Sequence, residues 1–406
     1  MLIAAKANPP AWKRHRWLFV ATCILVAGFP GRPAVADKFD AFNVMLGGTV
    51  SYDSNVFRNP DSANPQSDIV STGYVGLRID KPYAQQRFFL DATATAYRYD
   101  KFNYLNFDGL DYRAAWYWHL TPRMKGTLSA TRAENPTVFE ETLGQQRNVI
   151  TNENYVFNLD GWLVGGWHLL VGASRADQTS DQPFQATTDF RSVSGEAGIK
   201  YLTPSGNSIT VTPRWTEGEY LHSIFDPTDS LNDNYNQFEG EFQANWILSG
   251  YSTVTGRLAW VERRHDYFPE QRDFSGATGD LGYKWTPTDK LSLEWIASRR
   301  IRPYHNIVNS YVVDDVLSFT PVWRALDKVI LRMRLELVES DYRGGLAASS
   351  VAQRSDTTIS AQVGADWMLL RSVTLGASLK YQERTSNNLL NEYDDTIAKV
   401  SASLMF

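Results

Sequence analysis

Residues 399–406 read KVSASLMF, an alternation of polar and apolar side chains that ends on phenylalanine. Successive side chains of an extended strand point to opposite faces. The apolar face of this strand would carry Val400, Ala402, Leu404 and Phe406, and the other face Lys399, Ser401, Ser403 and Met405. A water-soluble chain usually ends in a frayed polar tail. The pattern instead predicts a strand whose last residue is anchored.

The same period of two recurs along most of the chain. Counting the alternating segments between turn signals predicts about 18 strands, and these begin near residues 42, 68, 87, 109, 125, 152, 167, 191, 207, 236, 252, 275, 291, 311, 328, 357, 373 and 394. An even count is expected when both ends of a membrane barrel lie on the same side. The sequence therefore predicts an all-β fold, a single transmembrane up-and-down antiparallel β-barrel over residues 37–406.

The connections between these segments alternate between short and long. Short turns carry Thr121-Pro122 and Thr286-Pro287, whereas polar stretches such as 59–66, 135–148 and 226–234 form the long loops. A soluble β-sandwich has no reason to alternate in this way, whereas outer-membrane barrels have short turns on one side and long loops on the other.

Aromatic residues precede the short turns. The members of this predicted girdle are Trp118, Trp162, Tyr201, Trp246, Trp285, Trp323, Trp367 and Phe406, spaced 38 to 45 residues apart. Aromatic rings settle at the headgroup level of a membrane. Trp162 is irregular, because Phe157 and Leu159 put it on the polar parity of its strand. The terminal Phe406 would fill the girdle position of the last hairpin, and a terminal aromatic resembles the signal that barrel-assembly machinery recognises.

A large soluble β-protein such as a propeller is the alternative fold, since repeats of about 40 to 45 residues also describe propeller blades. A blade needs no alternation of short and long loops. The glycine and Trp-Asp signatures of blades are missing from the sequence. The barrel is therefore favoured.

Residues 1–36 have the three parts of a secretory signal peptide: a basic stretch at 13–16, an apolar run at 17–29, and Ala34-Val35-Ala36 as a cleavage site. The alternative is a membrane anchor, but the apolar run is well short of the roughly 20 residues that a spanning helix needs. We expect export across the inner membrane and a mature chain that begins at Asp37.

Composition then limits the function of the mature chain. Cleavage would remove Cys23, the one cysteine, so disulfides and thiolate metal sites are excluded. The signal carries five of the 40 basic residues and none of the 45 acidic ones, which leaves a mature charge of 35 minus 45, or -10. A chain this acidic is not expected to bind nucleic acid.

The inward face of the predicted barrel carries many charges. The lumen of an 18-strand barrel is too wide for side chains to fill, so we expect it to hold water. The candidate lumen residues are Arg257, Arg300, Arg302, Arg332, Arg334, Glu294 and Glu336. A basic ladder that selects anionic or hydroxylated solutes could be formed by Arg300, Arg302, Arg332 and Arg334. The favoured alternative is a wall of salt bridges with Glu294 and Glu336.

The sequence offers no catalytic signature: it has no His-Glu-x-x-His, no Gly-x-Ser-x-Gly and no phosphate-binding glycine loop. The mature histidines, His119, His168, His222, His265 and His305, are scattered. The acidic loop with Asp226, Asp229 and Asp233 could hold a divalent cation, but a solvated surface loop is the favoured interpretation. We therefore expect neither an enzyme nor a metal or other cofactor.

Three stretches resemble one family: Ser51 to Arg58 (SYDSNVFR), residues 86–102, which open QRFFLD and close YRYDKF, and Tyr201 to Asn207 (YLTPSGN). Together they resemble the outer-membrane proteins encoded with exopolysaccharide biosynthesis clusters, the EpsL-type barrels found beside exosortase systems. The likeness covers essentially all of the mature chain, although Ser54 stands where the family usually has a second acid.

The resemblance implies a bacterial outer-membrane protein that conducts a polysaccharide to the cell surface. It also implies a periplasmic polysaccharide export protein and an inner-membrane polymerase as partners, besides outer-membrane lipid. Two other functions remain open: a general diffusion porin for small solutes, and a structural or adhesive surface protein that acts through its acidic loops.

Overall fold

The structure is a computed structural model that describes residues 41–136, 139, 145–182, 189–222, 233–304, 309–345 and 353–406. Residues 1–36, the predicted signal peptide, lie outside the described residues. The strands are β1 Phe42–Asp53, β2 Asp68–Tyr83, β3 Gln86–Tyr99, β4 Phe107–Thr121, β5 Met124–Pro136, β6 Val149–Val164, β7 Trp167–Ser180, β8 Phe190–Leu202, β9 Ser208–Tyr220, β10 Tyr235–Ser249, β11 Ser252–His265, β12 Phe274–Thr288, β13 Leu291–Pro303, β14 Tyr311–Leu326, β15 Val329–Arg343, β16 Ser355–Met368, β17 Val373–Ser386 and β18 Tyr393–Met405. Four short helices lie in the described connections: η3 Asp61–Ala63, η4 Asn103–Leu105, α2 Pro269–Arg272 and η6 Leu389–Asn391.

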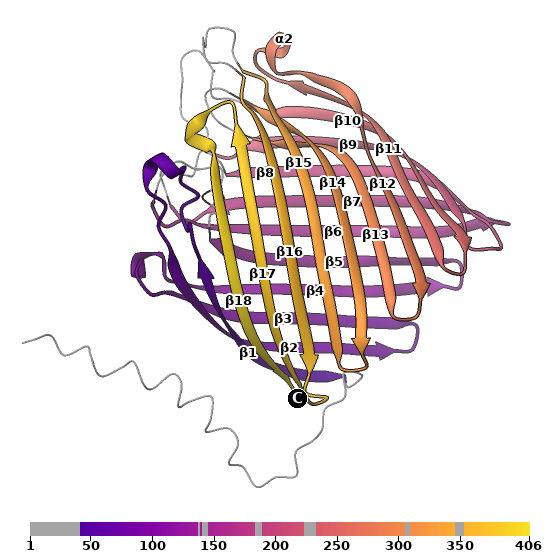
Figure 1. The fold of residues 1–406 in the computed structure, drawn as a ribbon. Helices are drawn as coiled ribbons and strands as arrows, with labels where there is room; N and C mark the ends of the chain where they lie inside the picture. Colours follow the sequence, from indigo (N-terminus) through magenta and orange to yellow (C-terminus); the bar gives the residue numbers. More distant parts are fainter. Residues whose placement is uncertain are drawn as a thin grey trace, which may run out of the picture. The chain divides into compact units, whose positions relative to one another are not determined.

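The 18 strands form one antiparallel sheet that closes on itself, which confirms the predicted fold (Figure 1). Each strand pairs with its neighbours in the sequence, and β1 pairs with both β2 and β18. The predicted strand starts agree with the observed ones, and the largest offset is in β6, expected near residue 152 and observed from Val149. No helix among the described residues is long and apolar enough to cross a membrane.

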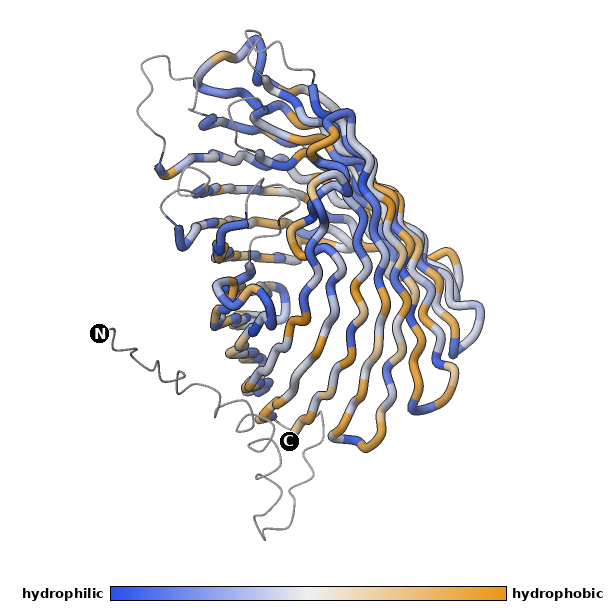
Figure 2. The backbone as a smooth tube through the Cα atoms, turned by 60° about the vertical axis from the view of Figure 1, so that its left-hand side comes forward, coloured by the Kyte–Doolittle hydropathy of each residue, from blue (hydrophilic) through white to orange (hydrophobic). Residues whose placement is uncertain are grey.

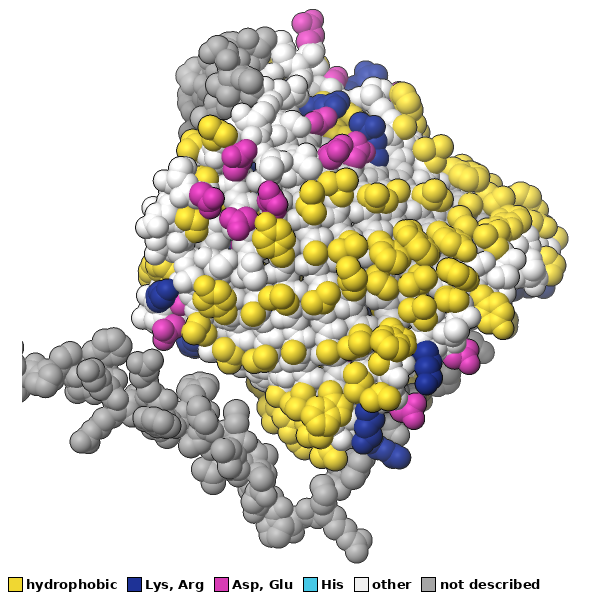
Figure 3. All heavy atoms as spheres, in the orientation of Figure 1, with side chains coloured by type: hydrophobic (Ala, Val, Ile, Leu, Met, Phe, Trp, Pro, Cys, Tyr) yellow, Lys and Arg dark blue, Asp and Glu magenta, His cyan; other side chains and the backbone are white. Residues whose placement is uncertain are grey.

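Apolar and polar residues alternate along the strands, as the orange and blue segments of Figure 2 show. Because successive side chains point to opposite faces, this alternation separates an apolar outer face from a polar inner face. In β17, Leu379 and Tyr381 are 48% and 41% exposed on the outside, whereas Gln382 on the inside is 5% exposed. A band of apolar side chains covers the outer face in Figure 3, and charged side chains gather above and below it. Such a wide exposed apolar surface is suited to lipid rather than to water.

The last residue is anchored, as its sequence pattern predicts. The backbone N–H of Phe406 donates to the carbonyl oxygen of Val44 at 2.9 Å, and the N–H of Val44 donates to the carbonyl oxygen of Phe406 at 2.8 Å. These two bonds extend the pairing of β18 with β1 and complete the ring. The terminal residue is therefore part of the wall.

Candidate functional site

The lumen wall holds a network of six charged side chains near the middle of strands β8 to β12. We call it the acidic wall, and it consists of Glu196, Arg214, Glu239, Glu241, Arg257 and Asp280. Arg257 is its centre: its guanidinium lies 2.6 Å from Asp280, 3.0 Å from Glu239 and 3.2 Å from Glu241. The acidic wall has four carboxylates and two guanidinium groups, so its formal net charge is 2 minus 4, or -2.

Two carboxylates of this network are buried. Glu239 is 7% exposed and Glu241 is 5% exposed. Arg214 lies 2.6 Å from Glu196 and within 3.9 Å of both buried acids. A buried carboxylate is tolerated when it is paired and hydrogen-bonded. The two arginines therefore stabilise a part of the wall that the sequence alone presents only as inward charges.

A second group of charges lies on strands β15 to β18. We call it the basic wall, and it consists of Arg332, Arg334, Lys380, Lys399, Glu336 and Asp366. Arg332 is paired with Asp366, and Arg334 with Glu336. Among the described residues, neither Lys380 nor Lys399 forms an ion pair, and Lys399 is exposed to the lumen. The basic wall thus carries two cations that have no counter-ion among the residues that the structure describes.

Register places these two lysines close together. Lys399 of β18 pairs with Ser378 of β17, and Lys380 of β17 pairs with Ile397 of β18. They are diagonal neighbours on the same face, at a Cα separation of roughly 7 to 8 Å. The acidic wall spans β8 to β12 and the basic wall β15 to β18, so the two walls lie on different parts of the ring of 18 strands.

The other predicted lumen residues are on the inner face, with partners that the sequence does not reveal. Arg300 and Arg302 both point at Asp314, at 3.4 and 2.9 Å, and so lie nearer the long loops than the basic wall does. The sequence favours a wall of salt bridges that involves Glu294 and Glu336. Of these two acids, Glu336 is paired with Arg334 in the structure. Glu294 pairs in register with Lys284 and forms no ion pair with any described residue.

The aromatic girdle lies on the outer face at the short-turn ends. Its exposed members are Tyr201, Trp246, Trp285, Trp323, Trp367 and Phe406, each 36% to 49% exposed. Trp118 is only 5% exposed, because its ring lies against Gly126 and stacks on Phe157. That these rings meet lipid headgroups stays a prediction.

Trp162 departs from the girdle as its parity indicates. It pairs in register with His168 on the inner face, and Arg123 lies 4.4 Å from its ring centroid. Trp167, which is not among the predicted girdle residues, takes its place on the outer face, with its ring 4.9 Å from that of Tyr201. The signal was present in the sequence, because Trp167 has the same parity as Leu169 and Val171.

The acidic loop before β10 is placed only in part. Asp226 and Asp229, and also His305, lie outside the described residues. Asp233 is 1% exposed and its carboxylate lies 2.9 Å from Arg272 of α2. Burial lowers the pKa of the Arg272 guanidinium, while Asp233 raises it. Within the described ranges no three His, Cys, Asp or Glu side chains are placed to hold a metal ion.

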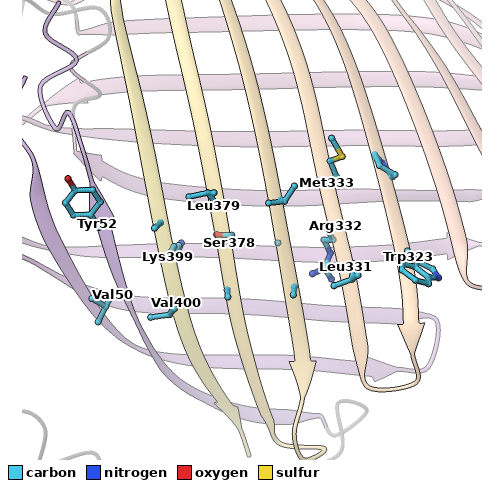
Figure 4. A pocket seen from close by; sticks show the side chains of 16 residues that line it. Val50, Tyr52, Trp323, Leu331, Arg332, Met333, Ser378, Leu379, Lys399 and Val400 are labelled. Atoms are coloured by element: carbon cyan, nitrogen blue, oxygen red, sulfur yellow. The ribbon is translucent and has the colours of Figure 1, made fainter. Parts of the chain in front are cut away.

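A groove of about 840 Å³ lies on the outer face of the barrel, across β14 to β18 and β1. Figure 4 shows Tyr52, Trp323, Leu331, Met333 and Leu379 along it. These side chains share the parity of the apolar band, so the groove belongs to the lipid-facing surface. It is no part of the lumen.

Comparison with known proteins agrees with this architecture. Residues 260–406 match the family described as "Putative beta-barrel porin 2". Among solved structures, the chain is similar to OccK2 (OpdF) of Pseudomonas aeruginosa in complex with glucuronate, with 10% identity, 90% of this chain and 98% of that chain covered, and a TM-score of 0.51. It is also similar to OccK1 (OpdK) of the same organism, with 10% identity, 90% and 99% covered, and a TM-score of 0.50. The chain has a porin-like barrel fold. No curated protein matches by sequence.

Proposed function

We propose that the protein is a diffusion channel of the bacterial outer membrane that passes small hydrophilic solutes. The observation that carries this proposal is the closed ring of 18 strands with an apolar outer face and a charged, hydroxyl-rich inner face. Strands of 12 to 16 residues are longer than the roughly 9 to 11 residues needed to cross the hydrocarbon core. Barrels of this strand number leave an aqueous lumen. The match of residues 260–406 to a porin family supports the same function.

The two walls carry excess charge of opposite sign and so give this lumen a transverse field. The acidic wall has two more acids than bases, and the basic wall has four cations against two acids. Because the arginines of the basic wall are paired, Lys380 and Lys399 are the contacts that it offers to the anionic groups of a passing solute. A polar solute is oriented between the walls, whereas an apolar one gains nothing and must displace ordered water.

The test is conductance of the mature protein in a planar lipid bilayer, with reversal potentials measured in a salt gradient. The double variant K380Q/K399Q should shift the permeability ratio toward cations, because it removes two positive charges near the middle of the lumen wall. The matched control is K125Q/K284Q, which removes two inner-face lysines near the short turns and should shift the ratio less. Absence of conductance from the wild type would refute the channel function, and equal shifts would refute the role of Lys380 and Lys399.

Acidic sugars are a useful probe for the same site. Glucuronate is present in the OccK2 structure, and it combines a carboxylate with hydroxyl groups. The carboxylate suits the two lysines, and the hydroxyls suit the inner face, which carries Ser51, Ser378, Ser401, Thr49 and Thr72. Glucuronate added to the bilayer chamber should interrupt the current of the wild type more often than that of K380Q/K399Q.

A second candidate is the conduit for an exopolysaccharide. It is favoured by the resemblance of residues 51–58, 86–102 and 201–207 to EpsL-type barrels. The hydroxyl-rich inner face is also compatible with a sliding sugar chain, which strong binding would stall. Periplasmic retention of polymer in a deletion strain would support the conduit, and unchanged polymer with altered uptake of small solutes would support the diffusion channel. Loss of surface attachment alone would indicate an adhesive protein.

A further inference from the structure

A second groove, of about 600 Å³, crosses the outer face of the barrel over strands β11 to β15. Its floor is low because small residues occupy the outward positions there, Gly279 of β12 and Ala297 of β13. Leu281 and Leu317 pair in register with Ala297 from its two sides, and their side chains are 59% and 55% exposed. Ala297 therefore lies in a trough between two projecting leucine side chains.

Stacked aromatic rings lie at the end of the trough that is nearer the short turns. Trp295 is the outward residue of β13 that precedes Ala297, and it pairs in register with Tyr283 and Phe319. Its ring centroid lies 5.7 Å from that of Tyr283 and 4.9 Å from that of Phe319. The four residues from Trp295 to Arg299 span roughly 13 Å of extended strand. The trough is therefore long and narrow, and it suits one extended hydrocarbon chain.

Charged side chains lie at the other end of the trough, where the apolar band of the outer face stops (Figure 3). On β13 the outward residues are apolar as far as Ala297, and the next is Arg299. On β15 they are apolar as far as Leu337, and the next is Glu339. Asp315 of β14 pairs in register with both Arg299 and Glu339. We call these three charged residues the rim, and all three line the groove.

The rim is incompletely paired. The Arg299 guanidinium lies 3.6 Å from the Asp315 carboxylate, and both side chains are about half exposed. A guanidinium has five N–H donors, so this one long contact leaves most of them available. Glu339 lies directly opposite Asp315, an arrangement of like charges that is destabilising, and it forms no ion pair with any described residue. Arg343, farther along the same face of β15, is already paired with Asp341 at 3.0 Å.

We propose that this groove binds one phospholipid whose headgroup carries both a phosphate and a primary ammonium, as phosphatidylethanolamine does. One acyl chain lies in the trough over Ala297. The phosphate accepts hydrogen bonds from Arg299, and the ammonium donates to Asp315 and Glu339. The inference goes beyond the proposed channel function and does not depend on it, because the groove belongs to the lipid-facing surface.

The charges of the rim select this headgroup among membrane lipids. One arginine and two carboxylates give the rim a formal charge of 1 minus 2, or -1. A cation between the two opposed carboxylates offsets their repulsion, and an ammonium group also supplies three N–H donors. Phosphatidylglycerol has the phosphate but no cation. Phosphatidylcholine has the same charges, but its quaternary nitrogen has no N–H to donate.

The test is mass spectrometry of the intact, mature protein in detergent, with one phospholipid added at a time. Phosphatidylethanolamine, phosphatidylcholine and phosphatidylglycerol with identical acyl chains are the probes. The wild type should retain one phosphatidylethanolamine, roughly fivefold more than of either other lipid, the order expected from a half-exposed charge pair. R299Q should lower retention of all three lipids, and E339Q that of phosphatidylethanolamine alone. Equal retention of the three lipids by the wild type would overturn the proposal.

Two further variants are matched controls. A297F fills the trough from the lipid side, so it should abolish retention of phosphatidylethanolamine while insertion and conductance stay unchanged. E383Q removes an outer-face carboxylate of β17 that also lies opposite an acid, Asp394, but does not line the groove. It should leave retention unchanged. Retention by A297F equal to that of the wild type, or equal losses in E339Q and E383Q, would contradict the lipid site and leave the channel function intact.

Discussion

The acidic wall and the basic wall belong to the same sheet and to the same inner face, yet their charges are used differently. In the acidic wall, register brings each arginine within reach of several carboxylates, and two of these are almost fully buried. In the basic wall each arginine is paired with one acid, and the two lysines have no acidic partner within the described ranges. The difference shows that inward charge alone does not define a solute site, because pairing decides whether a charge holds the wall or meets the solute.

The largest expected effect is on stability, from R257A. Removing this guanidinium leaves the buried Glu239 and Glu241 short of a partner, which should lower the free energy of unfolding by about 3 kcal/mol, somewhat less than for a fully buried pair. K399A in the basic wall should change it by less than about 0.5 kcal/mol. Urea unfolding of the protein folded into lipid vesicles measures both.

The triple variant R257A/E239Q/E241Q is the control for that prediction. Neutral amides need no counter-ion, so much of the lost stability should return. If R257A and K399A are equally mild, the distinction between the two walls is wrong.

The next effect is on ion selectivity. R334S leaves Glu336 without its partner and should shift permeability toward cations, as should R332S through Asp366, with insertion unaffected. The neutral replacement R334S/E336Q removes the whole pair and should restore the wild-type ratio. No described carboxylate is paired with Lys380, so the shift caused by K380Q should persist in that background. Reversal potentials in planar bilayers measure each case.

Ionic strength should separate the walls further. The screening length falls from about 10 Å at 0.1 M salt to about 3 Å at 1 M. The unpaired, solvent-exposed charge of Lys399 is screened over this range, so the difference in selectivity between wild type and K380Q/K399Q should shrink. The stability lost in R257A should change much less, because the affected carboxylates are buried. A selectivity difference that persists at 1 M would indicate direct binding rather than a field.

The smallest effect is expected from E294Q. Glu294 forms no ion pair with any described residue and lies near the short-turn end of β13. Its replacement should change unfolding free energy by less than about 0.5 kcal/mol, with a selectivity shift smaller than that of K380Q. A larger loss of stability would mean that the register partner Lys284 is a working counter-ion.

The fold was predictable because its main signal is local. A period of two along each segment sets the faces, and turn residues set the ends, so every strand from Phe42 onward is found close to its expected start. Pairing of charges was less predictable, because it depends on register between strands. Asp314, the shared partner of Arg300 and Arg302, lies on the next strand along. Lys380 and Lys399 have the inward parity in the sequence, but only the absence of partners distinguishes them.

The buried start of β14, where Tyr311, Val312 and Val313 are 5%, 0% and 2% exposed, also left a trace in the sequence. Tyr311, Val312 and Val313 are apolar on both parities, which is typical of a strand covered on both faces. The ring of Tyr311 lies 5.6 Å from that of Phe274 in β12 and 6.4 Å from that of His265 in β11, and no local pattern identifies these partners. Long-range packing of this kind requires the structure.

The bonds between Phe406 and Val44 make the order of strands cyclic. A ring has no first member, so the sheet itself does not require the polypeptide to open between β18 and β1. A circular permutant that opens at the short turn between Ser249 and Ser252, with Phe406 joined to residue 41 by a brief linker, would keep every strand beside the same two neighbours. The pairing of strands in the finished barrel therefore does not depend on which connection of the ring the polypeptide leaves open.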